Sequence, residues 1–193
     1  MSNYPNAGDG LRKIYVALIG MMVCILFNIV PVIGFLGSIG TLIFQVVYLV
    51  GCYQAGKDIP GCMTAFILEI MAIVIAVITS VKDVGGVLGL LFGIADIFLP
   101  IIIMALICFS VAGVMRKIGA EDAAKQGVRA WWIYLASSVL SAVLGFVFLL
   151  TAFSGNGFGG LIVYTVLLFA ITLVGYIFLL KFLKNSGEHL GSY

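Results

Sequence analysis

Residues 86–115 read GVLGLLFGIADIFLPIIIMALICFSVAGVM and form the longest apolar run of the chain. The run contains a single charged side chain, Asp96, and a single proline, Pro100. A helix needs about 20 predominantly apolar residues to cross the hydrocarbon core of a bilayer. The run is therefore long enough to span a membrane, and its excess length and its proline predict a helix that is tilted or broken.

Composition extends this prediction to the whole chain. Of the 193 residues, 63% are hydrophobic and 9% are charged, whereas soluble domains carry about 25% charged residues. A soluble core of this size cannot hide so much apolar surface, so we predict a single integral membrane domain over residues 1–193 with the lipid bilayer as its solvent. The net charge of +2 is too small to indicate nucleic-acid binding.

Glycine, proline and charged residues divide the chain into six apolar runs. We predict an all-α, polytopic transmembrane bundle with spans at about residues 14–31, 35–54, 62–81, 86–115, 131–153 and 159–182. Residues 116–130 are expected to be the one sizeable connection, with room for a short interfacial helix before Trp131 and Trp132.

The basic residues predict the orientation of these spans. With six spans, Lys82 falls on one side of the membrane, and the remaining basic residues fall on the other: Arg12, Lys13, Lys57, Arg116, Lys117, Lys125, Arg129, Lys181 and Lys184. Loops on the cytoplasmic side carry an excess of Lys and Arg. We therefore expect a multi-pass protein of the cell membrane with both termini cytoplasmic.

The connections alternate between short, nearly uncharged turns and charged ones, which predicts three helical hairpins at about residues 11–57, 61–118 and 128–185. Each hairpin opens with a glycine followed five residues later by an aromatic residue: Gly10 and Tyr15, Gly61 and Phe66, Gly127 and Trp132. This pattern fits either a triplicated hairpin or chance in a chain rich in glycine and aromatic residues.

Small residues at four-residue spacing predict close helix packing. They form one series in the fourth span (Gly85, Gly89 and Gly93) and another in the fifth (Ser137, Ser141 and Gly145). Packing within the bundle is one interpretation. A homo-oligomer or a partner membrane protein is the other.

Two acids, Glu69 and Asp96, lie inside the spans, where a carboxylate costs a few kcal/mol and is a functional hypothesis by default. If both helices are regular, each acid lies ~20 Å from the turn that joins them, so we expect neighbours at matching depth, facing the packing surface. Two such carboxyls do not both ionise easily; one keeps its proton or a cation bridges them. Pro100 leaves the carbonyl of Asp96 without its helical partner and so adds an oxygen to the site. The alternative is a purely structural, protonated pair.

Neutral polar residues also lie level across the predicted turns. Asn28 is level with Gln45, and Ser141 is level with Thr172. Such pairs predict interhelical hydrogen bonds that support assembly.

Several kinds of chemistry find no support in the sequence. The single His189 lies in the tail, and the cysteines (Cys24, Cys52, Cys62 and Cys108) form no CxxC pair. We therefore expect no metal site, no cofactor and no enzymatic activity. The glycine-rich GNGFGG at 155–160 lacks the Lys-Ser/Thr ending of a phosphate loop.

The stretch NIVPVIGFLGSIGTLIFQVVYLVGCYQAGKD, residues 28–58, combines a helix end, a Pro-x-x-Gly turn, a glycine-spaced helix and a charged end. In this it resembles small prokaryotic multi-helix membrane families known only as domains of unknown function. The resemblance covers one hairpin and implies a prokaryotic membrane protein without implying an activity.

Two functional hypotheses follow. The first is a small transporter or channel-like protein that uses Glu69 and Asp96 as a proton or cation site. The second is a non-transporting membrane module, such as an assembly partner, a membrane-perturbing effector or a lipid-binding scaffold.

Overall fold

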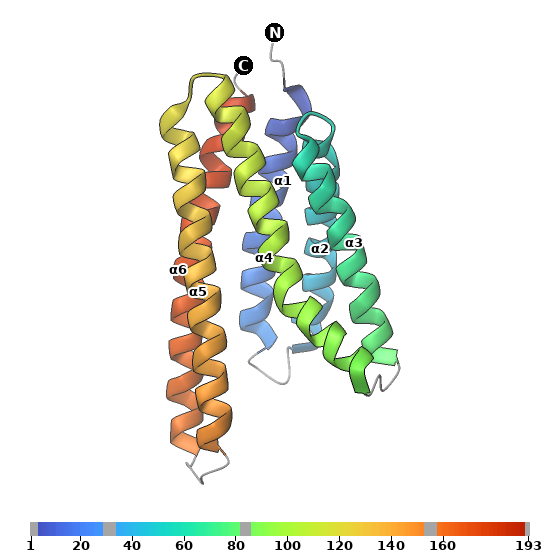
Figure 1. Cartoon of the computed structure of the whole chain (residues 1–193), viewed down its shortest axis with the longest axis vertical. Coiled ribbons are helices and arrows are strands. Elements are labelled where there is room, and N and C mark those ends of the chain that lie inside the picture. The colour runs from blue at the N-terminus through green and yellow to red at the C-terminus, as the bar shows by residue number, and fades with distance from the viewer. Residues whose placement is uncertain (1–3, 29–33, 82–85, 153–157, 192–193) are drawn as a thin grey trace.

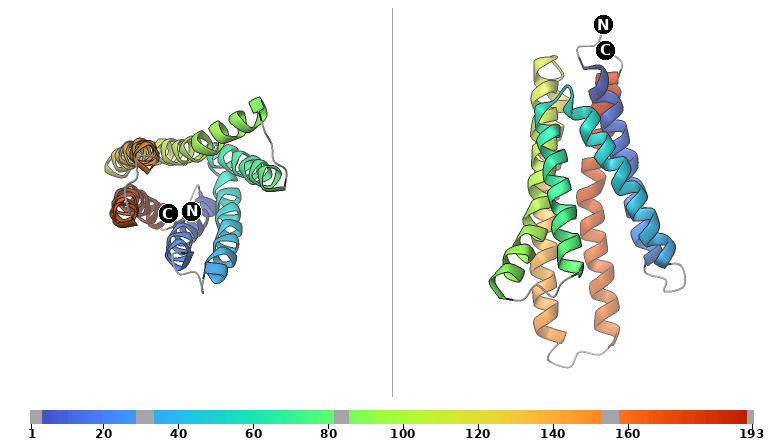
Figure 2. Two further views of the ribbon diagram at one scale, coloured as in Figure 1. Left: turned by 90° about the horizontal axis from the view of Figure 1, so that it is seen from below. Right: turned by 90° about the vertical axis from the view of Figure 1, so that its right-hand side faces the viewer.

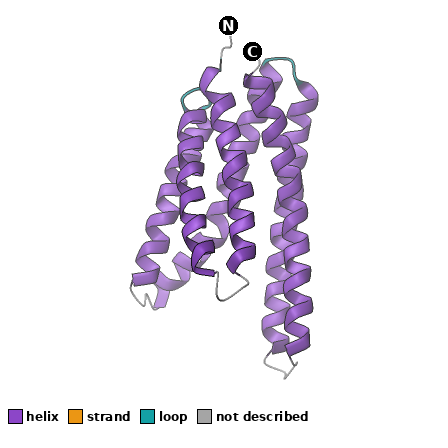
Figure 3. Ribbon diagram, turned by 180° about the vertical axis from the view of Figure 1, so that it is seen from behind, coloured by secondary structure: helices purple, strands orange, loops and turns teal. Residues whose placement is uncertain are grey.

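The structure is a computed structural model that describes residues 4–28, 34–81, 86–152 and 158–191. Within these ranges the chain forms helices and no strands (Figures 1 and 3). The helices are α1 (Pro5–Asn28), α2 (Gly34–Gly56), α3 (Pro60–Val81), α4 (Gly86–Lys117), α5 (Glu121–Ala152) and α6 (Phe158–Gly191). Six helices are long and apolar enough to cross a membrane, which confirms the prediction of an all-α chain with six such segments.

The helices extend beyond the predicted spans at the end that carries the termini. The expected connection at 116–130 is wrong in its extent, because α4 runs to Lys117 and α5 begins at Glu121. Gly119, at φ 81°, ends α4 with a Schellman motif in which the amide of Ala120 donates to the carbonyl of Met115 at 2.9 Å. Glu121 and Asp122 then place negative charge in the first turn of α5, where the helix dipole favours it.

The six helices are arranged as a ring. Each helix packs mainly against its neighbours in sequence, and α1 packs against α6 to close the circle. Seen along the bundle, the helices surround a common axis (Figure 2). Both termini lie at the same end of this ring (Figure 1).

The packed core occupies the half of the ring near the termini. Fully buried side chains there include Leu11, Cys52, Cys62, Val111 and Phe182. Towards the opposite end the α5–α6 pair separates from the other helices (Figure 1). Large apolar side chains of every helix are exposed. The ring is therefore closed at the end with the termini and open at the other.

Close backbone contacts hold the closed end together. A Cβ atom added to Gly10 would overlap the backbone of Ala55 in α2, and one added to Gly8 would lie 2.7 Å from the amide nitrogen of Gly191 in α6. Small residues let transmembrane helices approach this closely, and the packing replaces the hydrophobic drive that lipid cannot supply.

The loop between α2 and α3 also caps α1. The backbone amides of Asn6 and Ala7 both donate to Asp58 Oδ2, at 2.7 and 2.9 Å, and Asn6 Nδ2 donates to Oδ1 at 3.1 Å. A carboxylate at a helix N-terminus satisfies free N–H groups and interacts well with the dipole. Asp58 thus ties the start of α1 to the second connection of the ring.

We predict opposite effects for two glycine-to-alanine substitutions. Gly10→Ala should destabilise the fold by about 1–3 kcal/mol, because the new methyl group overlaps backbone that cannot move alone. Gly93→Ala meets no atom within 4 Å and should be neutral or stabilising by up to about 1 kcal/mol, since alanine favours the helix. Unfolding of the purified protein in mixed micelles measures both. Equal effects of the two changes on the free energy of unfolding would contradict close backbone packing at the closed end.

Candidate functional site

A cavity of about 140 Å³ lies where the closed and open halves of the ring meet. Every helix contributes to its lining: Leu18 and Met21 from α1, Gln45 and Tyr48 from α2, Glu69 and Ala72 from α3, Pro100, Ile103 and Met104 from α4, Tyr134 from α5 and Tyr176 from α6. A small-molecule or ion site is typically such a concave, mostly apolar space with a few polar groups that converge on it.

Glu69 supplies the carboxyl group of the cavity. The side-chain amide of Gln45 in α2 donates a hydrogen bond to Glu69 Oε1 in α3. Glu69 is half-buried and accepts a hydrogen bond from an uncharged amide. The bond gives the carboxyl oxygen a partner but does not cancel the charge of a carboxylate. The sequence singled out both residues but paired Gln45 with Asn28, whose side chain lies outside the described part of the chain.

Three tyrosines complete the polar lining. The rings of Tyr134 and Tyr176 meet edge to face with centroids 5.8 Å apart, across the α5–α6 interface. The hydroxyl of Tyr48 is buried and has no hydrogen-bond partner among the described residues, although the thiol of Cys52 lies beside it. A tyrosine side chain carries both a hydroxyl group and an aromatic ring that can attract a cation.

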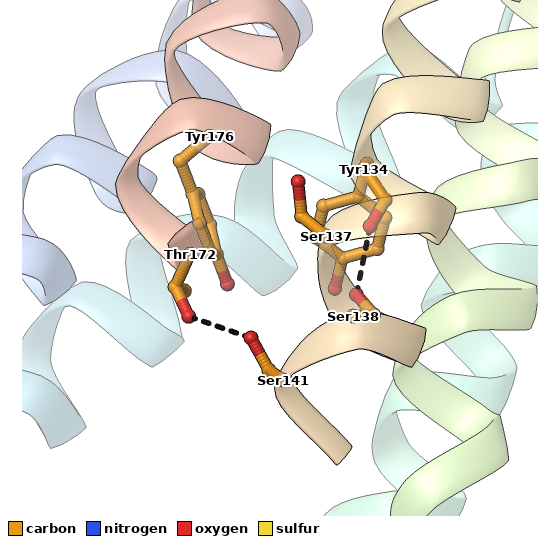
Figure 4. A pocket seen from close by; sticks show the side chains of 6 residues that line it. All are labelled: Tyr134, Ser137, Ser138, Ser141, Thr172 and Tyr176. Atoms are coloured by element: carbon orange, nitrogen blue, oxygen red, sulfur yellow. Dashed lines mark hydrogen bonds between the residues drawn. The ribbon is translucent and has the colours of Figure 1, made fainter. Parts of the chain in front are cut away.

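A second cavity of about 190 Å³ adjoins the first between α5 and α6 (Figure 4). Every residue that lines it carries a hydroxyl group: Tyr134, Ser137, Ser138, Ser141, Thr172 and Tyr176. Tyr134 and Tyr176 line both cavities and form the wall between them. We call the first space the Glu69 cavity and the second the hydroxyl cleft.

Two residues of the cleft were predicted to lie level, and the structure brings them together. The hydroxyl oxygens of Ser141 and Thr172 are 3.4 Å apart (Figure 4). The fifth-span series of small residues also faces α6, since a Cβ on Gly175 would lie 3.0 Å from Ser137 and one on Gly145 would lie 3.1 Å from the Tyr164 hydroxyl.

The expected pairing of Asp96 with Glu69 is not what the structure shows. The part of α4 level with Glu69 is Pro100 to Met104, and Asp96 lies four residues before Pro100, or ~6 Å further along the helix. Asp96 is also exposed, so the expectation that it faces a packed surface is wrong. The expectation assumed two regular helices of equal depth, but α4 bends and crosses the bundle obliquely (Figure 1).

Asp96 nevertheless continues the inward face of α4. Residues four apart share a helix face, and Pro100 lines the Glu69 cavity. Gly93 belongs to the same face and meets no atom within 4 Å, Gly89 is half-buried, and Gly85 lies outside the described residues. Of this glycine series, Gly93 therefore makes no close packing contact within the described part of the chain.

The tyrosines of the site were missed in the sequence analysis. Tyr48 and Tyr176 each interrupt an apolar run inside a predicted span, whereas Tyr134 lies near the start of the predicted fifth span. Tyrosine favours the membrane interface, so Tyr48 and Tyr176 were a signal of a polar interior, and Tyr134 was not.

Comparison of the chain with family models, curated proteins and solved structures finds no match. The Glu69 cavity contributes a single carboxyl, which balances one positive charge: a proton on the carboxyl or a monovalent cation beside it.

We predict one-sided access to the hydroxyl cleft. A Ser141→Cys variant should react with a charged, membrane-impermeant thiol reagent added from the side opposite the termini, because the α5–α6 pair separates from the other helices towards that side. The four native cysteines are free and buried and should give little background. Ser186→Cys, buried at the closed end, is the matched control. Labelling of Ser186→Cys as fast as Ser141→Cys would contradict the closed end.

Proposed function

We propose that this protein is a small membrane transporter or channel-like protein in which Glu69 binds a proton or a monovalent cation. The observation that carries the proposal is the convergence of all six helices on one cavity that holds a hydrogen-bonded carboxyl. A carboxyl within a membrane span is costly and marks ion and substrate pathways by default. Proposed with it are the absence of enzymatic activity and a location in the cell membrane.

In this proposal a cation that enters from the open end binds first at Asp96 and then at Glu69. Asp96 lies one helical turn from Pro100, on the side where the ring opens. Pro100 also removes a hydrogen bond that would otherwise satisfy the carbonyl of Asp96, which leaves that oxygen free for a cation. Interrupted helices of this kind often form the binding sites of transporters.

The orientation belongs to the same proposal. The excess of Lys and Arg on the side of the termini supports cytoplasmic termini, and the open end of the ring would then face outwards. The three-hairpin arrangement is supported by the glycines that open the predicted repeats. Gly61 lies against Ser110 in α4, and Gly127 lies against Phe182 in α6, so both face the second helix of their own hairpin, as Gly10 does. Association with a second copy or a partner membrane protein also stays a prediction.

A lipid-binding scaffold is the second candidate. A crevice of about 620 Å³ lies between α2 and α3 and is lined mostly by apolar side chains, including Leu42, Val46 and Ile73. Such a crevice suits an acyl chain. In this case Glu69 would be a structural group held by Gln45.

Flux through proteoliposomes separates the two candidates. With an imposed gradient of protons or sodium, the parent protein should carry current, and Glu69→Gln should reduce it by at least about tenfold, the equivalent of ~1.4 kcal/mol. Asp96→Asn should reduce it less, because Asp96 lies outside the cavity. Glu188→Gln, an exposed acid at the closed end, is the control for loss of charge.

Absence of flux in the parent protein, or flux that Glu69→Gln leaves intact, would refute the proposal. Loss of folding in Glu69→Gln, seen as aggregation in detergent, would assign Glu69 a structural role and favour the scaffold.

A further inference from the structure

The hydroxyl cleft beside the Glu69 cavity points to the kind of molecule that occupies the site. This inference rests on the proposed function, since it names the substrate class of the same site. The two cavities have about 140 and 190 Å³ and share Tyr134 and Tyr176. Each is smaller than an ordinary ligand pocket of about 300–1,000 Å³, whereas the two joined reach the lower part of that range. The joined space exceeds what a bare ion needs.

Two of the six hydroxyl groups that line the cleft are placed to accept hydrogen bonds. The hydroxyl of Ser137 donates to the carbonyl of Ile133 at 2.8 Å, and that of Ser138 donates to the carbonyl of Tyr134 at 2.9 Å. A hydroxyl has one proton and two lone pairs. Because the protons of both serines are committed to their own helix, the two oxygens present only lone pairs to the cleft.

The Glu69 cavity also offers hydrogen-bond acceptors. Glu69 accepts one hydrogen bond from Gln45 and keeps further lone pairs free. The hydroxyl of Tyr48, buried without a hydrogen-bond partner, can accept as well as donate. An occupant that suits these groups carries several N–H or O–H donors and one positive charge.

Aromatic rings favour an organic cation over a metal ion in this space. Tyr134 and Tyr176 line both cavities, and their rings meet edge to face between them. An ammonium group is attracted to the face of an aromatic ring, and its carbon chain packs against the ring. Figure 4 shows the Tyr176 side chain lying along the cleft beside Thr172.

We propose that the Glu69 cavity and the hydroxyl cleft together form the binding site of a small organic ammonium compound with a polar, donor-bearing tail, of the amino-alcohol class. The ammonium group pairs with Glu69. The tail passes Tyr134 and Tyr176 and donates to Ser137 and Ser138. No covalent step is involved.

Calorimetric titration of the full-length protein in detergent tests this assignment with three probes. These are 3-amino-1-propanol, propylamine, which lacks the hydroxyl, and 1,3-propanediol, which lacks the charge. The amino alcohol should bind about fivefold or more tightly than propylamine and about tenfold or more tightly than the diol, since each missing group leaves a partner unpaired.

Variants then locate the two ends of the ligand. Ser137→Ala combined with Ser138→Ala should remove the advantage of the amino alcohol over propylamine and leave the binding of propylamine within about twofold. Glu69→Gln should weaken both amines by about tenfold. Thr64→Val removes a hydroxyl that likewise bonds its own helix, at the carbonyl of Pro60, but lines neither cavity, and it should change nothing. If the double variant does not fold, Ser138→Ala alone makes the same test.

Two results would overturn the inference. If amines bind in a Glu69-dependent way but the serine variants do not affect the preference for the amino alcohol, the cleft is not part of the site and the proposed function stands. If protons or sodium cross the membrane through Glu69 but none of the amines bind, the substrate is not an organic cation. If Glu69→Gln changed neither flux nor amine binding, the proposed function itself would be refuted.

Discussion

The hydrogen bond between Gln45 and Glu69 is the interaction on which the interior of this protein depends. A carboxyl group cannot face hydrocarbon without a cost of a few kcal/mol, so it must be placed among other helices and given a partner. Here the partner comes from the adjacent helix, and the remaining four helices surround the pair with side chains that include three tyrosines. The ring therefore encloses a polar site, although large apolar side chains of every helix are exposed around it.

The two halves of the ring differ because different residues line them. At the end with the termini, Gly8, Gly10 and Gly127 allow backbone and side chains to meet closely, and large apolar residues fill the axis. In the closed half, α4 contributes the large buried residues Ile103 and Ile107. Towards the open end, the corresponding positions of α4 are Pro100, Asp96 and Gly93. Small and polar residues cannot fill the same space, and the bend of α4 carries its first half away from the axis (Figure 1).

The fold was largely predictable from hydropathy, because a spanning helix leaves a long apolar run whatever its neighbours are. The helix ends at the membrane surface were not, since α5 begins in the charged segment at Glu121 that hydropathy excludes. In the site, counting residues from the turn correctly predicted that Ser141 and Thr172 lie at the same depth and face each other. The same counting failed for Glu69 and Asp96, because a proline bend and an oblique helix break the rule of equal depth. Gln45 was found as a polar residue, but only the packing of α2 on α3 shows that Glu69 is its partner.

In the proposed function, the Glu69 carboxyl binds and releases a cation in the cavity that all six helices line. Infrared difference spectroscopy of the protein in lipid, recorded on adding sodium or an amine, observes this carboxyl directly. If Glu69 binds the cation, a carboxyl band should change when the cation is added, disappear in Glu69→Gln and persist in Glu188→Gln. A spectrum in which the cation changes no carboxyl band, or changes the same band in Glu69→Gln, would contradict cation binding by Glu69.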